Sequence, residues 1–499
     1  MKKILSASLT PYILLFFICF FILLKSFAAP FSHGVPPVDS SVFIYTAKQM
    51  IAGKLLYKEV FDHKGFMLYF FNIIGLKIFN GKWIGIWILQ FFCYLVTTIF
   101  LYKTLRFFYN KGISILAIAT VLLYQGTIEV GGNICETWAL PFTSIALFIF
   151  ARYFVEQKKF SIVQLFLLSA TFILTLFLRF NLVSLWGTFG IVVIYDLVKS
   201  KRWKDILLYT AYISVFCLLS VIPFFIYAYL KGIINDSFYG FFIFNLIYAS
   251  KIGANSIFKI FLMSLSTMGN SAFIFLGIII FTYILYSILY FKELSHKNFT
   301  VAIIISIFVI AFSCSMGQSD AHYFVQFVPI LIFPVAACFS FLIKNLLKRK
   351  WIFAIFFFLI LNMYFINKIL MGIRENYSKE NGILYTELNA IVTQCTTNAD
   401  KILEIGNDLN VFLYTDRESS SRFPYVYPII EKDKRIEEYY LTELEKSPLP
   451  KLIVTDYYWK FFSDDLKNRL NKILQEHYEK VDVKLERGEF YLSIWKLKN

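Results

Sequence analysis

The sequence predicts an α-helical polytopic membrane protein of about 11 transmembrane helices, with a small C-terminal α/β domain outside the cytoplasm. The first observation is composition: 58% of the 499 residues are hydrophobic, 20% are aromatic, and the mean hydropathy is +0.64. These values exceed those of soluble globular domains. The second observation is that apolar runs long enough to cross a bilayer as helices recur along the chain. The third is that these runs stop after Met371.

The direction of each span follows from the basic residues. Residues 1–370 hold 30 Lys and Arg but only 11 Asp and Glu, and the basic residues gather in short loops between alternate spans. This is the positive-inside pattern, so we place those loops in the cytoplasm. Lys2 and Lys3 precede the first run, which lacks a clear cleavage site and is expected to be retained. The predicted spans are 11–29, 83–105, 112–128, 138–155, 160–178, 181–198, 205–230, 270–291, 300–316, 324–344 and 351–370.

The net charge of +16 reflects this topology, so it does not indicate a nucleic-acid partner. An odd number of spans that starts in the cytoplasm places the C-terminal region on the outer side of the plasma membrane. The seven cysteines lie mostly inside the spans and form no CxxC pair. We therefore expect them to be packing residues rather than metal ligands.

The predicted domains are 1–370, a transmembrane domain with a large first outer loop at about 30–82, and 371–499, an α/β domain. Within the loop, FMLYFFNIIGLKIF is apolar but short for a span, so it indicates an interfacial helix. Residues 231–270 leave room for a re-entrant or interfacial helix.

The C-terminal region alternates strand and helix patterns. KILEIG (401–406) and KLIVTD (451–456) are typical of buried strands, and residues 464–478 carry apolar side chains at helical spacing. Residues 481–498 predict two strands joined at Arg487-Gly488.

Acidic residues in the transmembrane region favour one face. Seven of the eleven fall on the predicted outer side: Asp39, Glu59, Asp62, Glu129, Glu136, Asp236 and Asp320. Acids have little effect on topology, so the positive-inside rule does not explain this distribution. An ionisable cluster at one membrane face indicates a functional site. The simpler alternative is that solvated outer loops accept charges freely, which fits Asp39 and Lys64 less well because apolar and aromatic residues surround them.

The residue types at this face suit a particular chemistry. A carboxylate can act as a general base toward a hydroxyl, and Lys and Arg can hold a phosphate. One base with phosphate-binding cations indicates transfer from a phosphate-activated donor, whose leaving charge the cations stabilise. A donor carried on a lipid explains a site at the membrane surface.

The order of motifs resembles the GT-C superfamily of polyprenyl-phosphate-sugar-dependent glycosyltransferases. It is most similar to the bacterial branch near protein O-mannosyltransferases and aminoarabinose transferases. The segments that carry the likeness are VDSSVFIYTAKQMIAGKLLY, FDHKGFMLYF, NICETWALPF, FLRFN and SDAHYFVQFVPIL. Two positions depart from the family pattern: Ser40 stands where many relatives have Glu, and Gly65 and Phe66 replace the usual prolines.

The resemblance implies roles for individual residues. Asp39 would be the general base, and Glu136 a second acid that orients Lys64, the acceptor or the sugar. The implied phosphate-binding residues are Lys64, Arg179 and His63, and the implied weaker substrate contacts are Asp62, His322 and Tyr323. Two plainer alternatives remain open: Arg179 snorkels to the interface, and Glu136 is a helix-start acid.

The implied reaction moves a sugar, with inversion, from a polyprenyl-phosphate donor to a glycan, lipid or protein acceptor. We expect no cofactor and no obligatory metal. The alternatives are a transporter or flippase of a lipid-linked or amphipathic solute, and a catalytically inactive membrane scaffold. A transporter is less favoured, because transporters tend to place ionisable residues near the bilayer midplane, whereas those of this sequence collect at one predicted face.

Overall fold

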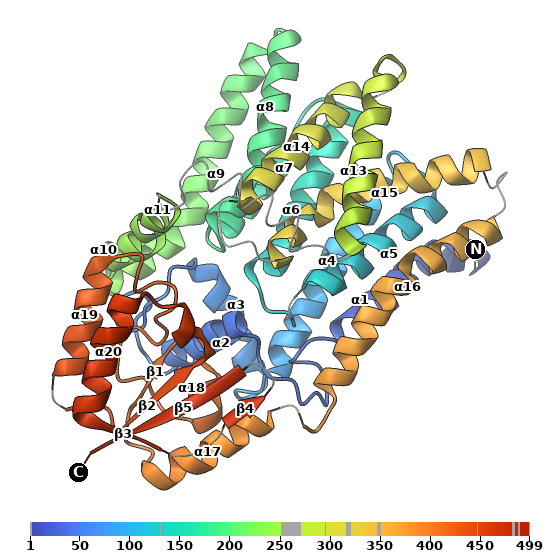
Figure 1. Cartoon of the computed structure of the whole chain (residues 1–499). Helices are drawn as coiled ribbons and strands as arrows, with labels where there is room; N and C mark the ends of the chain where they lie inside the picture. The colour runs from blue at the N-terminus through green and yellow to red at the C-terminus, as the bar shows by residue number, and fades with distance from the viewer. Residues whose placement is uncertain are drawn as a thin grey trace. The chain divides into compact units, whose positions relative to one another are not determined.

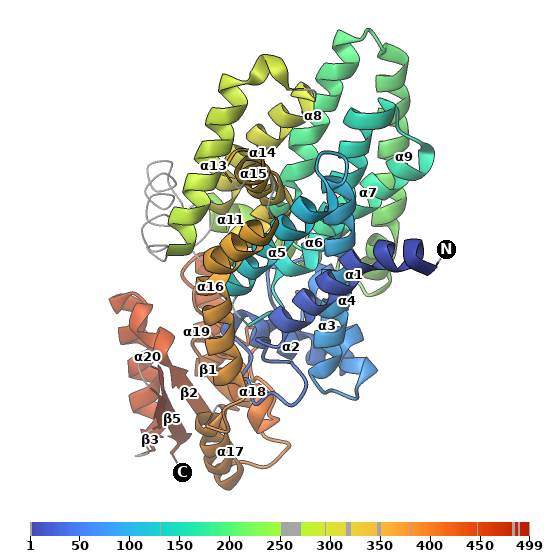
Figure 2. The same cartoon turned by 90° about the vertical axis from the view of Figure 1, so that its right-hand side faces the viewer.

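The computed structural model divides into two compact units, each described by itself (Figures 1 and 2). The helical unit comprises Met1–Ala29, Ile86–Ile226 and Gly253–Arg374, and the sheet unit comprises Pro30–Gly85, Tyr227–Ile252 and Glu375–Asn499. The structure describes residues 2–129, 131–250, 271–294, 296–315, 321–346, 351–380, 382–446, 448–481, 485–487 and 490–498.

Each predicted span coincides with helical segments over most of its length. The long helices are α1 (Lys2–Leu23), α4 (Ile84–Leu105), α5 (Lys111–Ile128), α6 (Cys135–Arg152), α7 (Ile162–Leu176), α8 (Ser184–Lys199), α9 (Trp203–Leu230), α13 (Ser271–Leu289), α14 (Lys297–Ser315), α15 (Val328–Phe341) and α16 (Trp351–Asn376). Within the described residues, seven helices are long and apolar enough to cross a membrane. The chain is thus a helical membrane protein, and the count of eleven spans stays a prediction.

Shorter 3-10 and π segments continue or connect these helices: η1 (Tyr153–Gln157), η2 (Phe180–Val183), η4 (Phe291–Glu293), η5 (Ala321–Phe327) and η6 (Leu342–Leu346). The first helix differs from its prediction, because α1 ends at Leu23 rather than at residue 29. Beyond it the chain turns, and the Lys25 ammonium donates to the carbonyls of Gly126 (2.8 Å) and Glu129 (3.1 Å).

The core of the helical unit forms where α5 packs on α15, α6 on α7, and α8 on α14. Helix α5 buries most of its side chains, whereas α9 leaves apolar residues such as Leu207, Leu218 and Leu230 exposed. Exposed apolar side chains along a whole helix suit contact with lipid.

The sheet unit contains helices α2 (Val38–Ile51), α3 (Phe66–Ile78), α10 (Ile234–Phe238), α11 (Phe244–Ser250), α17 (Ile383–Cys395), α18 (Asn410–Thr415), α19 (Lys434–Glu445) and α20 (Asp464–His477), with η3 (Tyr239–Ile243) and η7 (Tyr457–Phe461). The helix predicted in FMLYFFNIIGLKIF is confirmed as α3, and its place at the interface stays a prediction. Part of the predicted 231–270 helical region, residues 251–270, lies outside the described residues.

The sheet has five described strands: β1 (Ile402–Ile405), β2 (Leu452–Asp456), β3 (Tyr478–Lys480), β4 (Leu485–Arg487) and β5 (Phe490–Leu497). Their order is β1-β2-β5-β3, with β4 also on β5. The β1–β2 pair is parallel, and the other pairs are antiparallel. The predicted strands at 401–406 and 451–456 are confirmed, as are the two strands in 481–498, although Gly488 is outside the described residues.

The predicted helix at 464–478 is confirmed as α20, which lies beside α19 next to the sheet (Figure 1). The Ser463 side chain caps its start, and Asp464 and Asp465 in the first turn complement the helix dipole. The side chains of Leu466, Leu470, Ile473 and Leu474 are buried, which is the spacing of one helix face.

The first outer loop packs with the C-terminal region inside the sheet unit. The Phe61 amide donates to the Arg422 carbonyl (2.8 Å), and the ring of Phe61 lies 5.0 Å from that of Phe423. The Lys54 ammonium pairs with the Glu418 carboxylate at 2.9 Å. Residues more than 350 positions apart therefore form one body, and the predicted division of the sequence at residue 370 stays a prediction.

Candidate functional site

The segment between α2 and α3 reaches Asp62, His63 and Lys64 through a constrained turn. Tyr57 adopts a left-handed backbone (φ 70°), and its amide donates to the Val60 carbonyl (2.8 Å). A non-glycine residue in this region is strained and persists only where its surroundings hold it. The buried Tyr57 ring is held against Gly240, where an added Cβ would lie 2.5 Å from that ring.

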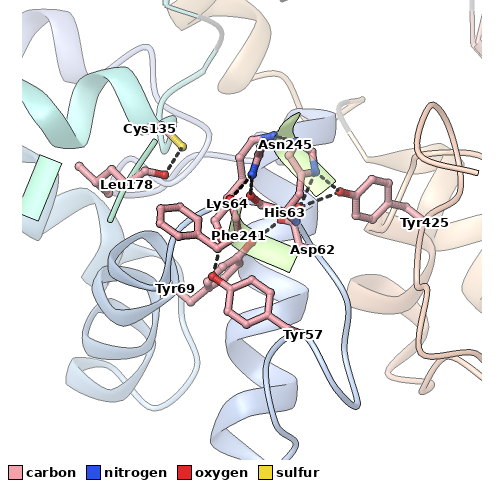
Figure 3. A network of polar contacts seen from close by, with 10 residues as sticks. All are labelled: Tyr57, Asp62, His63, Lys64, Tyr69, Cys135, Leu178, Phe241, Asn245 and Tyr425. Atoms are coloured by element: carbon pink, nitrogen blue, oxygen red, sulfur yellow. Dashed lines mark hydrogen bonds and ion pairs between the residues drawn. The ribbon is translucent and has the colours of Figure 1, made fainter. Parts of the chain in front are cut away.

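Asp62 is fully buried, and its carboxylate accepts several hydrogen bonds (Figure 3). Its donors are the hydroxyls of Tyr69 and Tyr425, the latter at 2.7 Å, and the His63 amide at 2.6 Å. Burial favours a higher pKa for Asp62, but the hydrogen bonds from His63 and Tyr69 and the charge of Lys64 hold the pKa well below its ordinary value. Asp62 is therefore an ionised carboxylate whose oxygens are occupied.

The contacts of His63 fix its tautomer. The Lys64 ammonium lies 2.7 Å from Nε2 of His63, and an ammonium can only donate a hydrogen bond. Nε2 must therefore be an unprotonated acceptor, which puts the ring proton on Nδ1, 3.2 Å from an Asp62 oxygen. The ring also stacks on Tyr248 at 5.6 Å. Asp62, His63 and Lys64 thus form a chain of hydrogen bonds that orients the Lys64 ammonium.

Hydrogen bonds from two side chains also hold the backbone of this turn at His63 and Lys64. The Asn245 side chain donates to the His63 carbonyl (2.8 Å), and the Tyr57 hydroxyl donates to the Lys64 carbonyl (2.8 Å). Lys64 itself is half-buried. Its ammonium has three N–H donors, and its hydrogen-bond partner among the described residues is His63, so two donors can face an anionic ligand.

Asp39 lies half-buried in the first turn of α2, where a carboxylate complements the helix dipole. It is close enough to Tyr425 for its charge to raise the pKa of that hydroxyl, behind the larger effects of burial and Asp62. Tyr425 therefore contacts Asp62 and lies within electrostatic range of Asp39. The neighbouring Ser40, the first departure from the family pattern, is fully buried.

Gly65, the second departure from the family pattern, keeps a backbone conformation that proline can also adopt. Gly65 precedes α3 with φ −76° and ψ 154°, and this φ lies in the range that proline imposes. The glycine is not required by its conformation, and the turn follows a path that the usual proline also allows.

In the helical unit, Glu136 and Arg179 form an ion pair. Glu136 is in the first turn of α6, and its carboxylate accepts from Arg179 at 2.8 Å. The Glu136 side chain is 1% exposed and that of Arg179 is 21% exposed, so the pair is mostly out of water. This contact favours an orienting role for Glu136, since its carboxylate holds the guanidinium.

His322 and Tyr323 lie beside this pair on η5. The Arg179 guanidinium stacks over the Tyr323 ring at 4.4 Å, a cation–π contact. The His322 ring lies 4.6 Å from that of Tyr323, and both residues are buried. Four predicted site residues thus gather in the helical unit.

The structure brings the predicted residues together in two groups, one in each unit. Asp39, Asp62, His63 and Lys64 share the sheet unit. Four residues that hold the turn were not predicted from the sequence: Tyr57, Tyr69, Asn245 and Tyr425. Within the described ranges, no three His, Cys, Asp or Glu side chains converge to hold a metal ion, and the predicted lack of a metal requirement stays a prediction.

A separate group of buried carboxyls, Glu404, Asp408 and Asp456, lies around β1 and β2. Asp456 ends β2 and accepts from the amides of Asn407 (3.0 Å) and Tyr458 (2.7 Å). Burial, with the charge of Asp408, raises the pKa of Asp456 to about 7, and burial also raises the pKa of Glu404 well above its ordinary value. These raised pKa values favour a protonated carboxyl in this group near neutral pH.

Solved structures match the chain over almost its whole length. It matches ArnT from Cupriavidus metallidurans bound to undecaprenyl phosphate with a TM-score of 0.61 and 10% identity, over 98% of each chain. It also matches the oligosaccharyltransferase AglB from Archaeoglobus fulgidus, in complex with an inhibitory peptide and a dolichol-phosphate, with a TM-score of 0.54 and 10% identity. That match covers 95% of this chain and 73% of AglB.

The chain has the GT-C fold.

Sequence comparisons add a different likeness. Residues 1–205 match the family described as putative competence-induced protein Ccs4 N-terminal domain, and no curated protein matches. The fold that the motif resemblance implied is confirmed by these structures.

Proposed function

We propose that this protein is an integral membrane glycosyltransferase that moves a sugar from a polyprenyl-phosphate donor to an acceptor hydroxyl. The observation that carries the proposal is the whole-chain likeness to ArnT, whose structure holds undecaprenyl phosphate. The oriented Lys64 ammonium supports it, because a fixed cation on a membrane protein suits a lipid-linked phosphate.

The proposed reaction is a single displacement at the anomeric carbon. The acceptor oxygen attacks from the face opposite the phosphate, and a new C–O bond forms as the bond to the phosphate oxygen breaks. The electron pair leaves with polyprenyl phosphate, and the configuration inverts. The hydroxyl proton passes to a general base.

Asp39 is better suited than Asp62 to act as the general base. The oxygens of Asp62 accept from Tyr69, Tyr425 and His63, and its pKa is well below the ordinary value, so it is a poor proton acceptor. Asp39 is half-buried at a helix start, where it is partly accessible. We assign Asp62 the role of orienting His63, and through it Lys64.

Lys64 is proposed to hold the departing phosphate. The growing negative charge would meet an ammonium that is already oriented by His63, so little reorganisation is needed during the reaction. Neither ring nitrogen of His63 is placed to donate a hydrogen bond to the phosphate, because Nδ1–H faces Asp62 and Nε2 accepts from Lys64. Its role is therefore to position Lys64 rather than to touch the phosphate.

The other predicted roles stay predictions. Arg179 is expected to bind phosphate and Glu136 to orient it, with His322 and Tyr323 as weaker substrate contacts. The proposed setting is the outer face of the plasma membrane, with a glycan, lipid or protein as acceptor. We propose no cofactor.

The first test is binding of undecaprenyl phosphate to the full-length, detergent-purified protein, measured by native mass spectrometry. Wild type should retain the lipid, and Lys64→Ala should lose most of it because the oriented cation is gone. Lys58→Ala is the matched control, since Lys58 is an exposed lysine of the same loop. Equal retention by wild type and Lys64→Ala would remove Lys64 from the phosphate site.

A further inference from the structure

Four helix ends of the helical unit enclose a groove with a volume of about 610 Å³. It is lined by the first half of α1, the end of α4, the start of α5 and the end of α6. The alternating direction of the first predicted spans requires these ends to share one membrane face, the face assigned to the cytoplasm. The groove lies at neither group of predicted site residues, because it includes none of them.

The groove is strongly basic. Lys103, Arg106, Lys111 and Arg152 line it, and the acid that lines it is Glu156, which pairs with the Arg152 Nε at 3.0 Å. Within the described part of the chain, no carboxylate lies within 4.0 Å of the other three cations. These three cations therefore have no ion-pair partner among the described residues; the Arg106 guanidinium also donates to the Tyr109 carbonyl.

The same groove has apolar and aromatic walls. Leu9 is exposed on α1, and the rings of Phe107 and Phe148 stack at 5.7 Å. Tyr12 and Tyr102, which also line the groove, meet edge to face at 5.4 Å. A cavity lined by both cations and apolar rings suits an amphiphile better than a small inorganic anion.

We propose that this groove binds the phosphodiester headgroup of an anionic glycerophospholipid. The phosphate would lie among Lys103, Arg106 and Lys111, and the acyl chains would follow the apolar side chain of Leu9 toward the surrounding bilayer. The positive-inside rule accounts for basic residues at this face but not for a cavity of this size between helix ends. Basic pockets between transmembrane helices are a known way to hold such headgroups.

The proposal does not depend on the proposed sugar transfer, and lipid retention tests it directly. Full-length delipidated protein is mixed with phosphatidylglycerol, or with phosphatidylcholine of the same chains, and observed by native mass spectrometry. Wild type should retain phosphatidylglycerol preferentially. Arg106→Ala/Lys111→Ala should weaken that retention about 25-fold, because each basic residue near an anionic lipid is worth about fivefold.

Two further variants separate a site from general surface charge. Lys201→Ala/Lys204→Ala removes the same charge from exposed residues outside the groove and should bind as wild type does. Glu156→Gln releases Arg152 and should tighten binding, an effect that a damaged fold would not give. Equal loss in both double variants, equal retention of the two lipids, or displacement of phosphatidylglycerol by millimolar inorganic phosphate would overturn the proposal.

Discussion

Tyr425→Phe tests whether the C-terminal region holds the Asp62–His63–Lys64 turn. The change removes one hydroxyl, which donates to the buried Asp62 carboxylate at 2.7 Å, and keeps the ring. A hydrogen bond to a charged group contributes about 1.5–3 kcal/mol. Asp62 keeps its donors from Tyr69 and His63, so we expect the turn to loosen rather than unfold.

Tyr425→Phe should change both the stability of the protein and its affinity for the lipid. The free energy of unfolding should fall by about 2 kcal/mol. Because a displaced Lys64 ammonium meets the phosphate in a poorer position, the Kd for undecaprenyl phosphate should rise about tenfold, which corresponds to about 1.4 kcal/mol.

The assay is lipid titration by native mass spectrometry, alongside thermal unfolding of the same samples. Tyr478→Phe is the matched control, because Tyr478 is also buried in the sheet unit and its hydroxyl donates to the Pro450 carbonyl at 3.0 Å. It should lower stability by about 1 kcal/mol and leave lipid affinity unchanged. If Tyr425→Phe binds the lipid as wild type does, or if Tyr478→Phe weakens binding equally, the account of the turn is wrong.

Three further predictions concern other parts of the chain. His63→Phe should weaken undecaprenyl phosphate binding because Lys64 loses its acceptor, and a titration that matches wild type would contradict the relay. Arg179→Met and Glu136→Gln should each lower stability by about 3–5 kcal/mol, since each breaks a mostly buried ion pair, while the double variant should recover part of the loss in thermal unfolding. The folded state holds a proton on Asp456 up to pH about 7, against an unfolded pKa of 3.8, so the stability of the sheet should fall by up to about 1.4 kcal/mol per unit between pH 5 and 7. Hydrogen exchange of β1 and β2 in the full-length protein should show that slope. Asp456→Asn should make it shallower, and the part that remains belongs to Glu404, whose pKa is also raised by burial; an unchanged slope would assign the proton elsewhere.

Local patterns in the sequence predicted most of the fold. Long apolar runs must satisfy their backbone groups internally near lipid, so each one predicted a helix. The strands β1 and β2 were predicted because both are short, apolar and bounded by polar residues. The strand β3 was missed, since three residues with one buried side chain carry no period.

The candidate site was predicted only in part. Asp62, His63 and Lys64 stand in a compact motif that resembles a turn of the GT-C superfamily, and that resemblance, with a lysine suited to a phosphate, indicated their role. Tyr425 is 363 residues from Asp62, and Asn245 is 182 residues from His63. No local pattern encodes such contacts, because they arise only when the first outer loop packs with the C-terminal region.

The most direct test of the account is turnover of a lipid-linked sugar by wild type and by Asp39→Asn. Purified full-length protein is incubated with a mixture of polyprenyl-phosphate-linked sugars and a cell-envelope acceptor fraction, and the release of polyprenyl phosphate is followed by mass spectrometry. We predict that wild type releases polyprenyl phosphate, while Asp39→Asn binds that lipid as well as wild type does and releases none from the donors. Release by Asp39→Asn at the wild-type rate would contradict the assignment of the base, and binding of the lipid by neither protein would contradict the proposed function itself.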